Sequence, residues 1–316
     1  MSFDHSISRR NVFKGAGGLA VASALGAGAA LGATTPAHAA GLDVVEHQTY
    51  GRMEYYKVST PSIAWKPRVN VLLPDGYDSG RRYPVLYLLH GGAQNFMKFD
   101  KEDDIRGLTA GRDLIVVMPD GGIAGWYCNP VTANLGPRNW ETFHIEELIP
   151  WVDATFRTFP EQAGRAVSGF SMGGFGALKY TAKYYGHFAS VSSHSGPASL
   201  RSINGAVAHW ANASSTIDLG GGTVYGTPWD EARVSADNPV ERIESYRGKR
   251  IFLVSGTEAF DVNEGFVLPT QREFAAALDR AGIQYERHEE PGGHFVRRER
   301  LQQDIDGIIA HLRKAG

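Results

Sequence analysis

The chain has 316 residues, of which 42% are hydrophobic and 21% are charged, and its formal net charge is −2. This composition is ordinary for a globular enzyme and excludes a disordered or fibrous protein, and the length allows one large hydrophobic core. The mildly acidic balance gives no electrostatic reason to bind nucleic acid or anionic lipid, so neither is expected as a partner.

The first 39 residues have the features of an export signal. Residues 8–14 (SRRNVFK) place two arginines before an apolar run of glycine and alanine at residues 15–33, and residues 37–39 (AHA) form a small-x-small cleavage site. The arginine pair matches the twin-arginine export pattern. A membrane anchor is the alternative, but the glycine-rich run is only weakly apolar. We therefore expect residues 1–39 to be a removed signal peptide and the protein to be secreted or extracytoplasmic, without stable membrane insertion.

Residues 40–316 are predicted to form a single domain. Segments rich in β-branched and aromatic residues alternate with helical patterns, which is typical of a mostly parallel sheet with helices on both faces. Strands are expected at residues 53–59, 68–73, 85–89, 114–118, 165–168, 189–193, 251–255 and 284–289. Helices are expected at residues 144–155, 172–185, 268–281 and 298–314. The first two strands resemble an antiparallel lead-in, and the continuous apolar runs at 85–89 and 114–118 indicate central strands buried on both faces.

A glycine-rich loop, His90-Gly91-Gly92-Ala93, follows the predicted strand at residues 85–89. Esterase sites take one oxyanion donor from a loop of this kind after an early strand. We predict the Gly92 amide as that donor, with Ala93 as the alternative. A plain strand-ending turn is the other interpretation, because glycine commonly ends strands.

The strongest signal is a GxSxG pattern, Gly169-Phe170-Ser171-Met172-Gly173, between a predicted strand and a predicted helix. In a nucleophile elbow the serine lies on a sharp turn, so the residues two before and two after it must be small. The helix N-terminus favours negative charge, and the Met172 amide is placed to donate to an oxyanion. We predict Ser171 as a catalytic nucleophile. The alternative is a chance match in a chain with 38 glycines.

Further along the chain, the helical and strand patterns loosen between residues 197 and 249, a stretch that includes Trp210 and Trp229. An irregular segment of this length is expected to form a lid over a site.

A base and an acid are expected near the C-terminal end. His294 lies on a glycine-flanked loop after the last predicted strand, where the fold expected here places its base. A lone histidine is more often structural, but no other one combines a late loop with adjacent glycines. Glu258, Asp261 and Glu264 all follow the strand at residues 251–255, where the acid belongs. The residues alone do not decide which of these three is the acid. Each could instead be a solvated loop charge or a charge that stabilises the N-terminus of the following helix.

Three features resemble the esterase D-like family of α/β-hydrolases, which includes the antigen 85 type mycolyltransferases. They are the Ser171 motif, the stretch WETF at residues 140–143 with Glu147, and the glycine-flanked His294. The resemblance covers nearly all of residues 40–316 and implies an α/β-hydrolase fold with a lid insertion at residues 197–249.

The resemblance also bears on the acid and on the acceptor. In mycolyltransferases a glutamate opens the helix after the penultimate strand, and Glu264 with the residues after it is similar to that segment. Feruloyl and formylglutathione esterases place the acid nearer the strand, which favours Asp261 or Glu258. Mycolyltransferases carry Asp and Arg on the oxyanion loop, where this chain has His90 and Ala93. They also carry Ser-Trp after the histidine, where this chain has Phe-Val, and both differences argue against trehalose as acceptor.

We therefore predict a serine carboxylic-ester hydrolase that acts through an acyl-enzyme intermediate on a small-molecule or lipid ester. No cofactor or metal is expected, because no HExxH motif or paired ligand spacing is present. Ordinary packing is the alternative role for the candidate substrate-pocket residues, which are His90, Ala93, Trp126, Trp140 and Phe295. Two other functions stay open: an acyltransferase of the mycolyltransferase or diacylglycerol acyltransferase type, and an inactive binding protein with a hydrolase fold. The sequence leaves the oligomeric state open.

Overall fold

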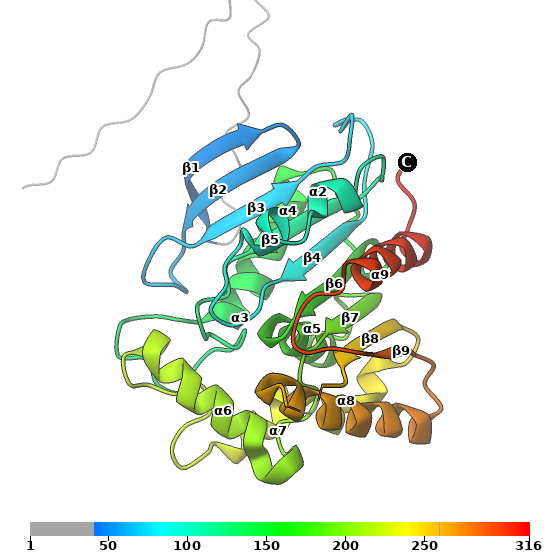
Figure 1. Ribbon diagram of the computed structural model, residues 1–316. Helices are drawn as coiled ribbons and strands as arrows, with labels where there is room; N and C mark the ends of the chain where they lie inside the picture. The colour runs from blue at the N-terminus through cyan, green and yellow to red at the C-terminus, as the bar shows by residue number, and fades with distance from the viewer. Residues whose placement is uncertain (1–40, 259) are drawn as a thin grey trace, which may run out of the picture. The chain divides into compact units, whose positions relative to one another are not determined.

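The computed structural model describes residues 41–258 and 260–316 (Figure 1). The predicted signal peptide at residues 1–39 lies outside the described residues. Within the described ranges, nine strands form one sheet in the order β1-β2-β3-β5-β4-β6-β7-β8-β9. None of the helices described there is long and apolar enough to cross a bilayer.

One edge of the sheet is antiparallel. β1 (Asp43–Tyr50) pairs with β2 (Met53–Ser59), β2 pairs with β3 (Arg68–Leu72), and β3 pairs with β5 (Ile115–Pro119), each in antiparallel orientation. The antiparallel lead-in is confirmed, but β1 was not expected. Seven of its eight residues are exposed, so the strand lacks the apolar alternation that marks a half-buried strand.

The rest of the sheet is parallel. It consists of β5, β4 (Val85–Leu89), β6 (Arg165–Phe170), β7 (Ser190–His194), β8 (Arg250–Gly256) and β9 (Glu286–Glu290). Every residue of β4 and β5 is buried, as their continuous apolar runs predict. The carboxyl ends of the parallel strands meet at one edge of the sheet, which is where ligands bind in folds of this kind.

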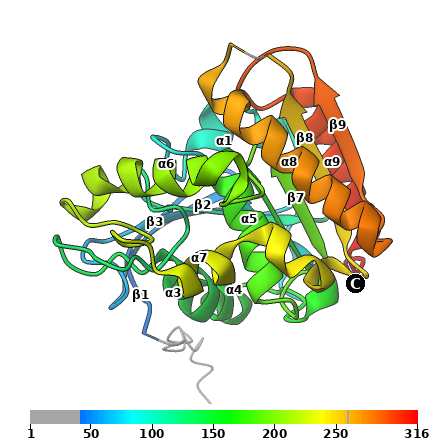
Figure 2. The same ribbon diagram turned by 90° about the horizontal axis from the view of Figure 1, so that it is seen from below.

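Helices cover both faces of the sheet (Figures 1 and 2). They are α1 (Lys98–Lys101), α2 (Ile105–Leu108), α3 (Trp140–Thr142), a π-helix (Phe143–Leu148), α4 (Ile149–Thr155), α5 (Met172–Lys183), α6 (Ser202–Leu219), α7 (Glu231–Asp237), α8 (Val262–Ala281) and α9 (Arg298–His311), with short 3₁₀ turns at Gln162–Gly164 and Pro239–Tyr246. One apolar cluster joins α4, α5 and α8 to one face, and a second joins α1, α2 and α9 to the other. The predicted α/β-hydrolase fold is confirmed.

The segment at residues 197–249 connects β7 to β8 and contains two helices, α6 and α7, that the sequence did not predict. The first turn of α6 has Ile203, Asn204 and Gly205 in left-handed conformation before the regular helix begins. Only two of its buried residues, Val207 and Leu219, are large and apolar, and the other six are small or polar. The helical period is therefore weak in the sequence.

Candidate active site

Ser171 occupies the sharp turn between β6 and α5, with φ of 55° and ψ of −119°. Its backbone N–H donates to the carbonyl oxygen of His194, at the end of β7, over 2.9 Å. A Cβ on Gly169 would overlap the carbonyl of Gly173, and a Cβ on Gly173 would overlap the carbonyl of Leu89. Backbone contacts therefore require both glycines, and this packing holds the serine in a conformation that L-residues rarely adopt.

The structure brings Ser171, His294 and Glu264 together in a hydrogen-bonded chain. His294 Nε2 lies 2.7 Å from Ser171 Oγ, and His294 Nδ1 lies 3.1 Å from Glu264 Oε1. Glu264 is in the first turn of α8 and is only 2% exposed. Because a carboxylate accepts hydrogen bonds, Glu264 accepts one from the Nδ1–H group of His294. Nε2 then carries no hydrogen and can accept a hydrogen bond from the Ser171 hydroxyl.

The other two candidate carboxylates do not contact the imidazole. Asp261 caps α8, and its Oδ1 accepts from the N–H groups of Asn263 (2.9 Å) and Glu264 (3.1 Å). Its Oδ2 accepts from the backbone N–H of His294 over 2.9 Å. Burial raises the pKa of Asp261, but these amides, His294 first, outweigh burial and lower its pKa below the ordinary value. Glu258 is exposed.

Two backbone amides are available near Ser171. Met172 is the first residue of α5, so its N–H has no acceptor within the helix. In the loop after β4, the Ala93 N–H donates to the Ile123 carbonyl over 2.8 Å, and the Gly91 N–H donates to Gln94 Oε1 over 2.9 Å. Within the described residues this leaves the Gly92 N–H without a partner, and Gly92 lines the same cavity as Ser171.

A cavity of about 420 Å³ opens beside Ser171. Its lining is mainly apolar, with a few polar groups, and consists of Gly92, Ala93, Gln94, Ile123, Ala124, Trp126, Phe170, Ser171, Met172, Trp210, Ser214, Ile217, Asn263 and His294. Trp126 packs edge-on against Trp210, with ring centroids 5.1 Å apart, and its indole N–H donates to Ser214 Oγ. Trp210, Ser214 and Ile217 belong to α6, so residues 197–249 supply one wall. The sequence predicts a lid from this segment but does not predict these three residues as lining the pocket, because only the packing of α6 shows which side chains face it.

Two of the five predicted pocket residues, Ala93 and Trp126, line this cavity. The structure corrects the other three. His90 is 1% exposed, and its Nε2 accepts from the Gly121 N–H over 2.8 Å; burial lowers its pKa to about 4, so it is a neutral structural residue. Trp140 is fully buried and stacks on a neighbouring histidine ring. Phe295 is half exposed and packs against the Arg297 guanidinium instead.

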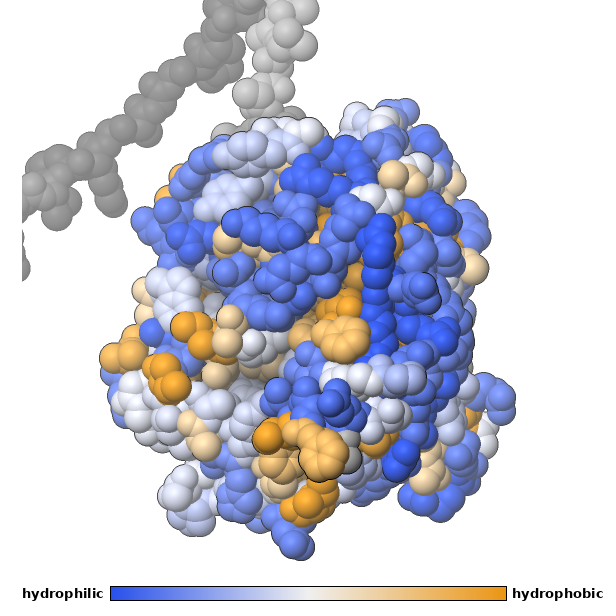
Figure 3. Space-filling view, viewed as in Figure 1, coloured by the Kyte–Doolittle hydropathy of each residue, from blue (hydrophilic) through white to orange (hydrophobic). Residues whose placement is uncertain are grey.

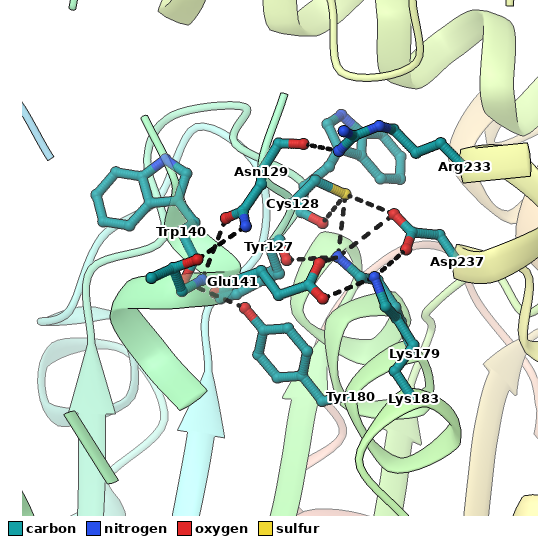
Figure 4. Close-up of polar contacts among 12 residues, drawn as sticks. Tyr127, Cys128, Asn129, Trp140, Glu141, Lys179, Tyr180, Lys183, Arg233 and Asp237 are labelled. Carbon is teal, nitrogen blue, oxygen red and sulfur yellow. Dashed lines mark hydrogen bonds and ion pairs between the residues drawn. The ribbon is translucent and has the colours of Figure 1, made fainter. Parts of the chain in front are cut away.

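A buried ion network joins α5 to α3 and α7 (Figure 4). Lys179 Nζ lies 2.6 Å from Glu141 and 3.5 Å from Asp237, and Lys183 Nζ lies 2.7 Å and 2.8 Å from the same two carboxylates. Burial raises the pKa of Glu141, but the two ammonium groups outweigh burial and lower its pKa to about 2. Glu141, part of the WETF stretch, therefore fastens α5 to α3, and Asp237 fastens α5 to the segment at residues 197–249.

Glu147, the acidic residue noted together with the WETF stretch, also has a structural role. Glu147 accepts from the hydroxyl of Ser62 over 2.6 Å and from that of Thr60. As for metals, no group of three or more His, Cys, Asp or Glu side chains within the described ranges is arranged to hold an ion.

Comparisons with known proteins place the chain in a family. A model of the Esterase family, described as "Putative esterase", matches residues 60–311. Esterase Rv1288 of Mycobacterium tuberculosis is 63% identical over 287 residues, which cover 87% of this chain and 63% of that protein. The chain thus spans less than two thirds of the length of this relative.

Solved structures share the fold. An S-formylglutathione hydrolase from Agrobacterium tumefaciens has a TM-score of 0.69 at 17% identity, covering 86% of this chain and all of that one. MPT51 of Mycobacterium tuberculosis has a TM-score of 0.69 at 20% identity, covering 85% of this chain and 99% of that one. The family match extends over most of the chain and over the elements that carry Ser171, Glu264 and His294. The chain therefore belongs to the Esterase family and has the α/β-hydrolase fold.

Proposed function

We propose that this protein is a serine carboxylic-ester hydrolase that works through an acyl-enzyme intermediate. The observation that carries the proposal is the hydrogen-bonded chain from Glu264 through His294 to Ser171. A nucleophile, a base and an orienting acid in this order form the arrangement that activates a serine hydroxyl. The family membership and the name of the relative Esterase Rv1288 support the same reaction class.

Each group has a role in the proposed mechanism. Ser171 Oγ attacks the ester carbonyl while His294 Nε2 takes the hydroxyl proton, and Glu264 stabilises the imidazolium that forms. The amides of Met172 and Gly92 donate to the developing oxyanion. His294 then returns the proton to the leaving alcohol, and water, activated by the same imidazole, releases the acid. The acyltransferase alternative shares the first step and differs only in the acceptor.

The cavity supports an ester with an apolar acyl group. Its walls are largely aromatic and aliphatic, so burial of an apolar chain is favourable, by about 25 cal/mol per Å² of apolar surface. At its rim, Ile123 and Ile217 are 56% and 77% exposed. Figure 3 shows hydrophobic residues gathered in patches on one face of the molecule, among hydrophilic ones. We further propose that residues 197–249 form a lid over this cavity, within a single domain of residues 40–316.

The twin-arginine pattern at residues 8–14 supports export of the protein. Export is part of the proposal, because the pattern lies outside the described residues.

Substitution of the nucleophile tests the proposal. Ser171→Ala should lower kcat on a p-nitrophenyl ester by about 10⁴- to 10⁶-fold and abolish labelling by a fluorophosphonate probe. The matched control is Ser235→Ala, which removes a half-buried serine hydroxyl of α7 that donates to Glu241 and does not line the cavity beside Ser171. This variant should leave both readouts unchanged. Full esterase activity in Ser171→Ala would refute the assignment, and an inactive, unlabelled wild-type protein would favour the binding-protein alternative.

A further inference from the structure

The peptide group between Gly293 and His294 is held at both of its polar ends by side chains of opposite charge. The Gly293 carbonyl accepts from Arg297 Nη2 over 3.1 Å, and the His294 N–H donates to Asp261 Oδ2 over 2.9 Å. Hydrogen bonds to charged groups are roughly twice as strong as neutral ones. The Arg297 cation on one side and the Asp261 anion on the other therefore fix the orientation of this peptide plane, which adjoins the His294 side chain.

Asp261 also holds the acidic partner of the imidazole. Its second oxygen, Oδ1, accepts from the backbone N–H groups of Asn263 and Glu264. One carboxylate thus connects the backbone that carries His294 to the backbone that carries Glu264. The 3.1 Å contact between the two side chains depends on the relative position of these two segments.

The loop leaves space for this carboxylate. A Cβ on Gly293 would lie 2.6 Å from Asp261 Oδ2, which is closer than such atoms approach. Gly293 does not have a positive φ, so a side chain at this position would disturb the Asp261 carboxylate rather than strain the backbone. Arg297 is only 9% exposed and also donates to the carbonyl of Pro291, over 3.3 Å, which braces the loop from the other side.

We propose that Asp261 is a positioning residue that keeps His294 aligned between Ser171 and Glu264, with Arg297 as its counterpart on the same peptide group. This inference rests on the hydrolase function proposed above and adds a requirement to it. Asp261 does not line the cavity beside Ser171, so its loss should affect the chemical steps and leave substrate binding intact. Misplacement of a catalytic group by about 1 Å can cost about 100-fold in rate.

Asp261→Ser separates positioning from helix capping. Serine caps helices about as well as aspartate, but its single oxygen cannot also reach the His294 N–H. The expected result is a kcat about 10- to 100-fold below wild type, with KM within twofold and little change in Tm. The matched control is Asp230→Ser, because Asp230 caps α7 by accepting from the Arg233 N–H and lies in no part of the site. This variant should keep kcat and KM.

Gly293→Ala probes the same contact without removing a charge. The added methyl group should push the Asp261 carboxylate away from the His294 N–H and lower kcat by a similar factor. In the Asp261→Ser background no carboxylate is displaced, so adding Gly293→Ala should cost less than about threefold more. Non-additivity of this size identifies two changes that act on one interaction.

Two outcomes overturn the proposal: a kcat for Asp261→Ser within twofold of wild type, or fully additive losses in the double variant. Thermal unfolding of each variant shows whether a low kcat comes from a misfolded protein. If Asp261→Ser is misfolded, Gly293→Ala decides the question by whether it lowers kcat and leaves KM unchanged. Ser171→Ala in the same assay separates a failure of the hydrolase mechanism from a failure of the positioning role. If it stays active the hydrolase mechanism itself fails, whereas if it is inactive and Asp261→Ser is fully active only the positioning role fails.

Discussion

Trp126 and Ser214 are joined by a hydrogen bond of 2.9 Å that links the wall of the cavity beside Ser171 to helix α6. Trp126 lies on the loop between β5 and α3 and packs in the hydrophobic core. Ser214 belongs to the segment between β7 and β8. This bond therefore helps to set how closely α6 approaches Ser171.

Ser214→Ala should weaken substrate binding more than catalysis. The variant leaves the Trp126 indole N–H without its partner in a partly buried position, at a cost of about 1 to 3 kcal/mol. We expect KM for an ester with an apolar acyl group to rise severalfold while kcat stays within about twofold. Thr216→Ala is the control, because this exposed hydroxyl of α6 bonds only to the carbonyl of Ala213. Equal KM values for the two variants would contradict the role of the wall.

Glu264→Gln tests which carboxylate serves the imidazole. An amide cannot stabilise the imidazolium and can turn its NH₂ group toward Nδ1, so kcat should fall by about 10²- to 10⁴-fold. Glu258→Gln is the matched control, because Glu258 is exposed and makes no side-chain contact with His294. Steady-state kinetics of both variants give the answer, and a larger loss in Glu258→Gln would reverse the assignment.

The buried central strands and the turn that carries Ser171 were predictable, because both leave local patterns. Val85–Leu89 is a continuous apolar run, and Ser171 lies in a short glycine-flanked motif between a strand and a helix. His294 was predictable from its place late in the chain. The selection among three carboxylates depended on a family resemblance, since all three lie within seven residues of each other.

Most of the residues that line the cavity were not predictable in this way. Trp210 and Ile217 reach the site only because α6 folds back over it, and Trp140 looks like a pocket aromatic in sequence although it is fully buried. The role of Asp261 was hidden for a related reason. A capping aspartate has a recognisable sequence position, but its second contact, with His294, joins residues 33 positions apart.

Gly173→Ala should disrupt the nucleophile turn. A Cβ there would overlap the carbonyl of Leu89 and lie 2.6 Å from that of His90, so the end of β4 has to move. Overpacking of this kind costs about 1 to 3 kcal/mol or more, and here it also displaces the loop that carries Gly92. We expect a lower Tm and at least a 100-fold loss of kcat. Gly186→Ala, where an added Cβ meets no atom within 4 Å, should keep both values.

Glu141 should contribute stability that is lost in acid. Its pKa is about 2 in the folded protein against an ordinary value of 4.5, so its contribution is complete above pH 4.5 and disappears as the pH falls toward 2. The difference in pKa corresponds to about 3 kcal/mol. Urea unfolding should show Glu141→Gln less stable than wild type at pH 7, with a difference that shrinks on acidification. Glu146→Gln changes an exposed neighbour and should show no such trend.

The connection between β7 and β8 is far longer than the geometry of the sheet demands. Neighbouring parallel strands can be joined by a crossover of about a dozen residues, whereas this one extends over residues 195–249. The surplus length forms part of the cavity wall and carries none of Ser171, Glu264 and His294. Substitutions in this connection can therefore change the shape of the cavity, and with it the ester that fits, while Ser171, Glu264 and His294 keep their places.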